Sequence, residues 1–429
     1  MINENSIHAV NAARFHGRGG EHFTAPLYHS YCFSNLPGAF KHALGLESRT
    51  RLPDDVLGGL PTQYDKVIFL YIDAFGWNAF ERARDNSPFL QRFVTEGVVS
   101  KLTSQFPSTT TAHVTTLYND APVGMHGVYE WFYYEPLLDR VICPLMYAFA
   151  GDEQPGTLVP TGVAPPQILP TRTLHMDLQA VGVNSYVFQH EGLSESPYAM
   201  MANAGATKSI SFKTFPEACT LLANAVKHSR EKALYFLYWD AVDTIGHDYG
   251  PSSVHYAAEL DACLTTLERV LMKQMDPPPG STLLLVSTDH GQVDVGLDTN
   301  FYLNVALPEI VPLVATNRDG LPLAPAGSPR DFFLHVKPGC ADEAADILSQ
   351  RLDGFADIRR TEDLIDAGFF GPDVSATFRA RVSDLVILPY GGNTVAWYEE
   401  GRFEMKHRGQ HGGLHQHEME IPLLALALD

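Results

Sequence analysis

Three short runs of mostly apolar residues dominate the hydrophobic pattern of the chain. They are Lys66–Ile72, Ala233–Tyr238 and Thr282–Thr288, and none of them alternates between apolar and polar positions. Uninterrupted apolar runs of this length are typical of strands that are buried on both faces of a parallel sheet. The pattern therefore predicts an α/β fold with a mainly parallel central sheet flanked by helices.

Helical segments are predicted between these strands. One helix is expected at Asn78–Phe93, and another is capped by Thr214 and runs to His228. A third helix should pack on the core, because four leucines recur at helical spacing, and the run Pro277–Gly280 should end it. These leucines are Leu260, Leu264, Leu267 and Leu271.

The pattern changes after residue 300, where shorter elements alternate. We interpret residues 301–384 as an inserted α+β cap or lid, and residues 1–300 and 385–429 as the catalytic domain. The insert should contain two strands and a helix, and the chain should then return to the catalytic domain and end in a strand. The segments concerned are Phe332–Val336, Asp342–Leu352, Phe355–Ile358, Asp384–Leu388 and Glu418–Ala425.

Composition narrows the choice of partners and of compartment. The 429 residues are 45% hydrophobic and carry a net charge of −20, which argues against a nucleic-acid polymer or an anionic membrane as partner. The five cysteines are scattered without a C-x-x-C pair, as in chains with reduced thiols. We see neither a signal peptide nor an apolar run near the roughly 18 residues of a membrane helix. We therefore expect a cytoplasmic protein that would need metal ions to hold phosphate.

Each of the three predicted strands is followed by an acidic residue. Asp73 and Asp289 come directly after their strands, and Asp243 lies just past the third. The carboxyl ends of parallel strands share one edge of a sheet, which is where such sheets bind ligands. A single aspartate there could instead cap a helix, but three of them, two with a histidine nearby, predict one common site.

The segment around Asp243 offers a metal half-site. Asp243 and His247 are four residues apart, so one helical turn would place both on the same face. A carboxylate and an imidazole aimed at one point suit zinc or a similar divalent ion. A solvated loop with a capping aspartate would explain this fragment alone equally well.

A run of hydroxyl residues, Ser108 to Thr111, stands before another predicted helix. Such residues can be simple caps, but successive threonines are poor helix formers, which indicates that a hydroxyl group is wanted there. The segment Tyr129–Pro170 is aromatic and then rich in Gly and Pro, without clear periodicity. We interpret it as loops over the active face that form a wall for the substrate.

Five motifs in order carry a family resemblance. They are Ile72-Asp73, Thr110 with His126-Gly127, D-x-x-G-H-x-x-G-P from Asp243 to Pro251, S-x-D-H-G from Ser287 to Gly291, and H-G-G-L with the Pro-Leu ending from His411 to Leu423. Together they resemble the alkaline phosphatase superfamily and, within it, the type I phosphodiesterase/nucleotide pyrophosphatase family. The C-x-P-x-R motif of the sulfatase branch does not occur.

The resemblance implies an alkaline-phosphatase-like sheet, two zinc ions, and Thr110 as a nucleophile that forms a phospho-threonine intermediate. One metal ion would be held by Asp73, Thr110, Asp289 and His290, and the other by Asp243, His247 and His411. On spacing alone, His411 has three alternatives, which are His407, His415 and His417. Four further residues lie near the motifs without a matching position: Asp240, Asp248, His255 and Asp294.

One position departs from the family pattern. The phosphodiesterases usually carry an asparagine three residues after the nucleophile, where it binds a phosphoryl oxygen, and this chain has His113. We expect His113 to bind substrate, with a structural helix residue as the alternative. A histidine becomes cationic as the pH falls through about 6.5. A cationic His113 would favour monoester dianions in mild acid, so the preference among diesters, monoesters and phosphonates stays open.

The leading hypothesis is a two-metal phosphoric ester hydrolase, specifically a phosphodiesterase or nucleotide pyrophosphatase acting on a small molecule. A phosphomonoesterase, a phosphonate hydrolase or a phosphomutase on the same fold is the alternative, because a fold does not fix a function. A non-catalytic metal-binding or scaffold protein is a third hypothesis. Thr110 argues against it, because a metal store has no need of a nucleophile.

Overall fold

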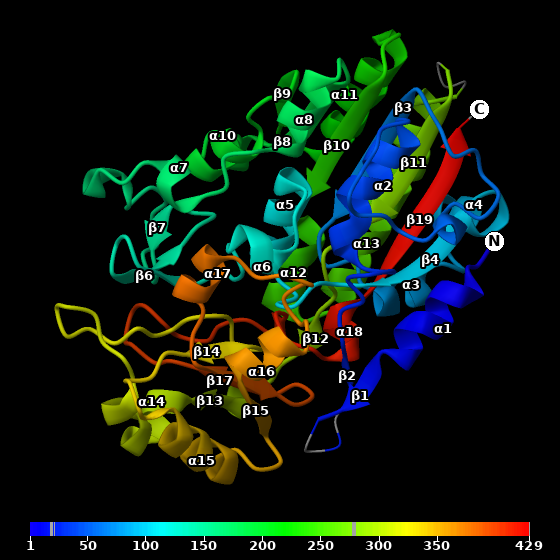
Figure 1. The fold of residues 1–429 in the computed structure, drawn as a ribbon. Coiled ribbons are helices and arrows are strands. Elements are labelled where there is room, and N and C mark those ends of the chain that lie inside the picture. Colours follow the sequence, from blue (N-terminus) through cyan, green and yellow to red (C-terminus); the bar gives the residue numbers. More distant parts are fainter. Residues whose placement is uncertain (18–19, 21, 277–279, 429) are drawn as a thin grey trace.

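A seven-stranded sheet forms the centre of the computed structural model, which describes residues 1–17, 20, 22–276 and 280–428 (Figure 1). The strand order is β4-β19-β11-β3-β10-β8-β9. β19 is antiparallel to both of its neighbours, and the other strand pairs are parallel. The strands are β3 (Lys66–Ile72), β4 (Val98–Thr103), β8 (Asn184–His190), β9 (Lys208–Phe212), β10 (Ala233–Trp239), β11 (Thr282–Ser287) and β19 (Glu420–Leu428).

The three predicted apolar runs are β3, β10 and β11, within one residue at their ends. Strand β4 was not predicted, because Ser100 and Lys101 interrupt its apolar run although both are buried. The Lys101 ammonium group is paired with the Glu420 carboxylate of β19, which offsets the cost of burying it.

Successive residues of the strands face two different cores. In β3, Val67, Phe69 and Tyr71 belong to one core, and Ile68, Leu70 and Ile72 to the other. This division follows from the period of two along a strand. Helices cover both faces, as predicted: α2 (Leu36–Ala43), α5 (Thr110–Asn119) and α8 (Leu174–Ala180) on the first, and α4 (Pro88–Thr95), α11 (Phe215–His228) and α13 (Val254–Thr266) on the second.

The helix predictions have mixed outcomes. The helix expected at 78–93 is two helices, α3 (Trp77–Ala83) and α4, because the Ser87 side chain caps a new helix that Pro88 begins. α11 is confirmed, with a capping box between Thr214 and Glu217. The four leucines are buried on α13 and on the π-helical turn that follows it. The break predicted at 277–280 falls mostly outside the described residues.

The α+β unit lies at one end of the sheet, below it in Figure 1. Its three-stranded sheet has the order β14-β16-β15, so the boundary predicted between residues 384 and 385 is wrong. β16 is the central strand of this small sheet rather than the return to the catalytic domain, because it pairs with strands on both sides. The elements are β14 (Phe332–Leu334), α15 (Ala341–Arg351), β15 (Ala356–Arg360), α16 (Thr361–Asp366), α17 (Ala376–Arg381) and β16 (Leu385–Pro389).

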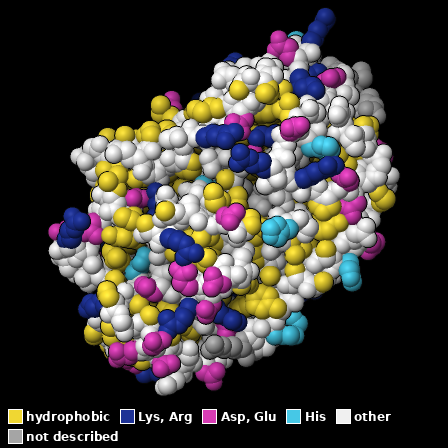
Figure 2. All heavy atoms as spheres, in the orientation of Figure 1, with side chains coloured by type: hydrophobic (Ala, Val, Ile, Leu, Met, Phe, Trp, Pro, Cys, Tyr) yellow, Lys and Arg dark blue, Asp and Glu magenta, His cyan; other side chains and the backbone are white. Residues whose placement is uncertain are grey.

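The unit also extends beyond both predicted ends. β13 (Asn300–Tyr302) pairs with β17 (Thr394–Ala396). Trp397, just after β17, is buried in the same hydrophobic core as the residues of α15. We call residues 300–405 the cap unit. On the face shown in Figure 2, Lys and Arg side chains are interspersed with Asp and Glu side chains.

Two further segments pack against this frame. The N-terminal extension forms α1 (Glu4–Ala12), and the Asn3 amide donates to the Val99 carbonyl of β4 at 2.8 Å. The segment predicted as loops at 129–170 contains a small antiparallel sheet of β5 (Tyr133–Glu135), β6 (Arg140–Cys143) and β7 (Ala148–Phe149). Among the described residues, no helix is long and apolar enough to cross a membrane.

Candidate active site

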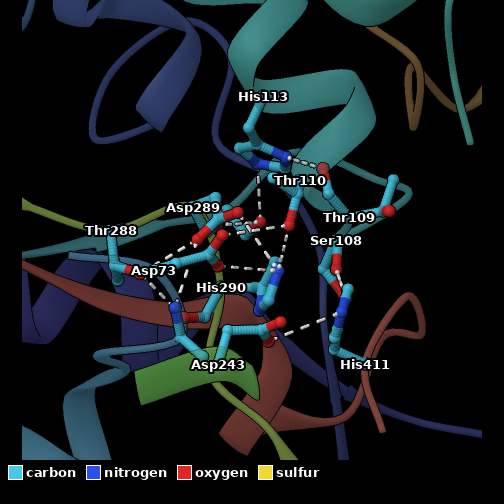
Figure 3. A network of polar contacts seen from close by, with 12 residues as sticks. Asp73, Ser108, Thr109, Thr110, His113, Asp243, Thr288, Asp289, His290 and His411 are labelled. Atoms are coloured by element: carbon cyan, nitrogen blue, oxygen red, sulfur yellow. Dashed lines mark hydrogen bonds and ion pairs between the residues drawn. The ribbon is translucent and has the colours of Figure 1, made fainter. Parts of the chain in front are cut away.

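The three predicted strand-end acids converge at one edge of the sheet. β3 lies between β11 and β10, so Asp73 stands between the other two strand ends. His290, just after β11, places Nε2 3.1 Å from Oδ2 of Asp289 and 3.5 Å from Oδ1 of Asp73 (Figure 3). Asp243 reaches the same place from the first turn of α12 (Ala241–Tyr249).

Two groups of side chains have the geometry to hold a metal ion. Within each group the ligand atoms lie within 4.8 Å of one another, and His290 belongs to both: Asp73, Asp289 and His290 form one, and Asp243, His290 and His411 the other. His247 adjoins the second group, since its Nε2 is 3.3 Å from Oδ2 of Asp243. The structure thus brings all the predicted ligands together, with His290 shared between the groups.

The three histidines of the site are held in one tautomer. The Nδ1 atom of each faces a backbone carbonyl: His247 that of Gly409 at 2.8 Å, His290 that of Gly291 at 3.0 Å, and His411 that of Ser108 at 2.9 Å. A proton on Nδ1 leaves the lone pair on Nε2, which points at the carboxylates. Histidines that ligate metals are usually oriented in this way by a second partner.

Two carboxylate oxygens at the centre of the site lack a hydrogen-bond donor from the described residues. Oδ1 of Asp73 and Oδ2 of Asp289 are buried and have no hydrogen-bond partner among the described residues. Burial and the neighbouring carboxylates of Asp289 and Asp243 raise the pKa of Asp73. Clustered carboxylates of this kind are stabilised by a cation. The donor set of acids and imidazoles therefore fits divalent metal ions.

Three side chains that the sequence did not predict for the site donate hydrogen bonds to the three aspartates. Tyr238 donates its hydroxyl hydrogen bond to Oδ2 of Asp73 at 2.5 Å, and Gln292 donates to Oδ1 of Asp243 at 2.6 Å. The Thr288 hydroxyl donates to Oδ1 of Asp289 at 3.0 Å. Tyr238 ends an apolar run that predicts a buried strand, and nothing in that run indicates a role for its hydroxyl group in the site. Gln292 and Thr288 flank or lie within motifs, so their positions could have suggested this role.

Thr110 is the first residue of helix α5. Its Oγ1 lies 3.4 Å from Oδ2 of Asp73 and 3.2 Å from Nε2 of His290. Thr109 and Thr110 both line the pocket, but Thr109 is buried whereas Thr110 is half-buried, and Thr111 is buried away from the pocket. The amide groups at the start of α5 also bring a partial positive charge, which favours an anion there.

His113 lies in the protein interior rather than beside the pocket. Its Nε2 accepts a hydrogen bond from the Gln105 amide at 2.9 Å, and its Nδ1 is 2.7 Å from the Thr109 carbonyl. Burial lowers the pKa of His113 to about 4. The expected contact with a phosphoryl oxygen is not supported by this geometry, because both ring nitrogens are already engaged. His113 instead holds the turn that leads into Thr110.

The other histidines and acids near the motifs lie outside the two ligand groups. His411, rather than its three alternatives, stacks on His290 with ring centroids 3.6 Å apart. His407 flanks His247 at 4.8 Å and lines the pocket together with Asp248. His126 of the Thr110 motif is buried 3.0 Å from the Thr116 hydroxyl, so it supports α5 and does not reach the site.

A pocket of about 490 Å³ opens beside these residues. One side consists of Thr110, Asp243, His247 and His411, and the opposite side comes from the cap unit. Two residues of the aromatic segment predicted as a substrate wall, Trp131 and Phe132, also line it. The volume suits a small organic ligand.

The mostly parallel sheet has the alkaline-phosphatase-like α/β fold expected from the motifs, with two candidate metal-ligand groups at its strand ends. Residues 67–414 match the model of the type I phosphodiesterase / nucleotide pyrophosphatase family. The chain therefore belongs to this family of metal-dependent phosphoesterases. No curated protein sequence matches the chain.

Solved structures share the fold at low identity. Murine ectonucleotide pyrophosphatase / phosphodiesterase 5, an inactive threonine-to-alanine variant in complex with AMP, aligns with a TM-score of 0.63 at 17% identity, covering 84% of this chain and 87% of that one. The human protein gives 0.62 at 17%, with 84% and 87% covered. Phosphonoacetate hydrolase from Sinorhizobium meliloti 1021, in complex with phosphonoformate, gives 0.59 at 15%, with 83% and 89% covered.

Proposed function

We propose that this chain is a two-metal phosphodiesterase that hydrolyses small phosphoric esters through Thr110 and a phospho-threonine intermediate. The observation that carries the proposal is the position of Thr110. Its hydroxyl oxygen contacts Asp73 and His290 of one ligand group at 3.4 and 3.2 Å and also lines the pocket. A nucleophile must reach both its activating group and the substrate, and Thr110 does so.

The ligands divide between two ions, which we propose to be zinc. Asp73, Thr110, Asp289 and His290 would hold one ion, and Asp243, His247 and His411 the other. Bound there, the ions would lower the pKa of the Thr110 hydroxyl and offset charge on the phosphoryl oxygens. The protein's own share is orientation: Tyr238 and Gln292 fix the acids, and three backbone carbonyls fix the histidines.

The chemical step needs Thr110 at the start of α5. Its oxygen attacks phosphorus while the bond to the leaving group breaks, the hydroxyl proton passes through solvent to the departing oxygen to give the alcohol, and the helix terminus stabilises the developing negative charge. Water then attacks the phosphorus of the phospho-threonine, which returns a proton to the Thr110 oxygen and releases the phosphate monoester. The pocket volume of about 490 Å³ favours a diester over a monoester, because a second ester group has space to bind there.

Comparison of three threonine variants tests the proposal. Thr110→Ala should lower the turnover of bis(p-nitrophenyl) phosphate by several powers of ten, since a nucleophile and a metal ligand are lost together. Thr111→Ala and Thr109→Ala are the matched controls and should keep most of the activity. Mass spectrometry of acid-quenched enzyme should find a p-nitrophenyl phosphoryl group on Thr110. A dead Thr109→Ala with an active Thr110→Ala would contradict the assignment.

The alternatives are tested in the same assay. A phosphomonoesterase would prefer p-nitrophenyl phosphate, and a phosphonate hydrolase would prefer phosphonoacetate. A phosphomutase would return phosphate to a second position of its substrate and release none. A metal-binding protein without activity would turn over none of these compounds when zinc is present.

A further inference from the structure

The two sides of the pocket differ in chemistry. The sheet-edge side carries Thr110 together with Asp243, His247 and His411. The side contributed by the cap unit and by the aromatic segment before it is largely apolar, and its largest side chains are Trp131, Phe132, Phe332, Trp397, Phe403 and Met405. A phosphoryl group bound at the first side would direct its substituent onto the second.

The polar side chains on the apolar side are engaged within the protein. The Ser328 hydroxyl contacts Oδ1 of Asp331 at 2.5 Å and the His411 carbonyl at 3.0 Å. The Arg402 guanidinium donates to Glu399 at 2.9 Å and to the Ala150 carbonyl at 2.6 Å, and it lies 5.1 Å from the centre of the Phe403 ring.

These contacts decide what the apolar side can bind. The Ser328 hydroxyl has no free donor, and the Arg402 guanidinium already uses two of its five N–H groups within the protein. Most polar groups of a sugar or nucleobase brought there would face aromatic side chains, and unpaired polar groups are costly to bury. An apolar group pays no such cost and gains from leaving water. Two further charged residues line the pocket, Asp248 of α12 and Glu404 of the cap unit. Both are acidic and would repel an anionic extension such as a second phosphate.

We propose that the preferred substrate is a phosphodiester with one large apolar substituent, alkyl or aryl, which binds against Trp131, Trp397 and Phe403. This inference rests on the proposed function and makes it more specific. It identifies these three side chains as residues that set specificity without touching the reacting atoms.

A series of p-nitrophenyl phosphodiesters tests the inference, since the leaving group stays constant. The second substituent would be methyl, butyl, octyl, phenyl or 5′-thymidyl. We expect kcat/KM to rise about threefold to fourfold for each added methylene until the pocket is filled. The octyl or the phenyl ester should exceed the thymidyl ester, and which of them leads distinguishes alkyl from aryl recognition. A thymidyl ester that exceeds both would overturn the inference.

Two variants localise the effect. Phe403→Ala and Trp131→Ala should flatten the dependence of kcat/KM on chain length, mainly by raising KM for the longer esters. Val305→Ala is the matched control, because Val305 is an exposed apolar residue of the cap unit outside the pocket. A chain-length dependence that survives both pocket variants would place the apolar substituent elsewhere.

The two proposals fail in different ways. If Thr110→Ala and metal removal abolish hydrolysis of every ester but chain length has no effect, only the apolar specificity is wrong. If no ester is hydrolysed in a manner that depends on Thr110 and metal, the proposed function itself is wrong.

Discussion

The hydroxyl group of Tyr238 donates a hydrogen bond to Oδ2 of Asp73 at 2.5 Å, across the neighbouring ends of β10 and β3. Asp73 is buried, and its Oδ1 atom is left facing His290. The tyrosine thereby fixes which carboxylate oxygen is available to a metal ion, while Oδ2 is shared between the hydroxyl groups of Tyr238 and Thr110.

Tyr238→Phe should therefore weaken metal binding without unfolding the protein. Loss of a hydrogen bond that orients a metal-ligating side chain typically lowers metal affinity or activity about 10-fold to 100-fold. Competition with a zinc-binding dye would measure the affinity, and circular dichroism would check the fold. Tyr186→Phe, on the neighbouring strand β8 and stacked on Tyr235, is the matched control. Equal zinc affinity in Tyr238→Phe and the wild type would show that Tyr238 has no part in metal binding.

Protein purified without chelator should contain close to two transition-metal ions per chain, most of them zinc. Elemental analysis measures the content, and His247→Ala should lower it toward one, because His247 adjoins only the second ligand group. His255→Ala is the control, since His255 is exposed and stacks on Tyr249 away from both groups. One metal ion or none in the wild type, with no gain of activity on adding zinc, would count against the two-metal assignment.

His113→Asn should lower stability rather than change substrate preference. The folded pKa of about 4 lies below the ordinary value near 6.5. The histidine therefore contributes stability above pH 6.5 that is lost as the pH falls through 4. Removing its bonds to Gln105 and Thr109 should cost about 1–3 kcal/mol at pH 7. Urea unfolding at pH 7 and at pH 4.5 measures both effects.

The pH dependence of substrate preference tests the alternative role of His113, which is to bind substrate. Because the ring stays neutral between pH 5.5 and 8, the ratio of diester to monoester turnover should have the same pH profile in wild type and variant. A ratio that narrows in mild acid in the wild type alone would restore the role in substrate binding expected from the sequence.

The sequence predicted the site better than it predicted the frame around it. β3, β10 and β11 are buried on both faces, so each shows as an apolar run, and the aspartates that follow them meet because these strands are neighbours. The convergence of Asp73, Asp243 and Asp289 depends on this topology alone. It could therefore be predicted before any side-chain geometry was known.

The features that were missed depend on long-range partners. β4 contains Lys101, whose burial is made tolerable by Glu420, more than 300 residues away. β16 has the apolar run of a main-sheet strand but pairs inside the cap unit, and a local pattern does not choose between partners. His113 has the spacing of a substrate ligand. Only the fold shows that its ring points inward.

Glu130 is fully buried next to the pocket residue Trp131. Burial is the main cause that raises the pKa of Glu130 to about 8, and the buried carboxyl of Asp331 nearby has a raised pKa as well. The folded protein therefore binds a proton that the unfolded chain releases near pH 4.3. Stability from this group is complete below that value and is lost as the pH rises through 8.

Glu130→Gln keeps the shape of the protonated side chain without its titration. The variant should match the wild type within about 1 kcal/mol at pH 5 and be the more stable protein at pH 9. Glu135→Gln is the matched control: Glu135 is also buried but is paired with Arg381 at 2.7 Å, so its loss should destabilise the protein at both pH values. Urea unfolding at pH 5 and pH 9 measures the free energy of unfolding of both variants and of the wild type. A Glu130→Gln variant that is no more stable than the wild type at pH 9 would show that Glu130 is ionised in the native protein, with a cation beside it.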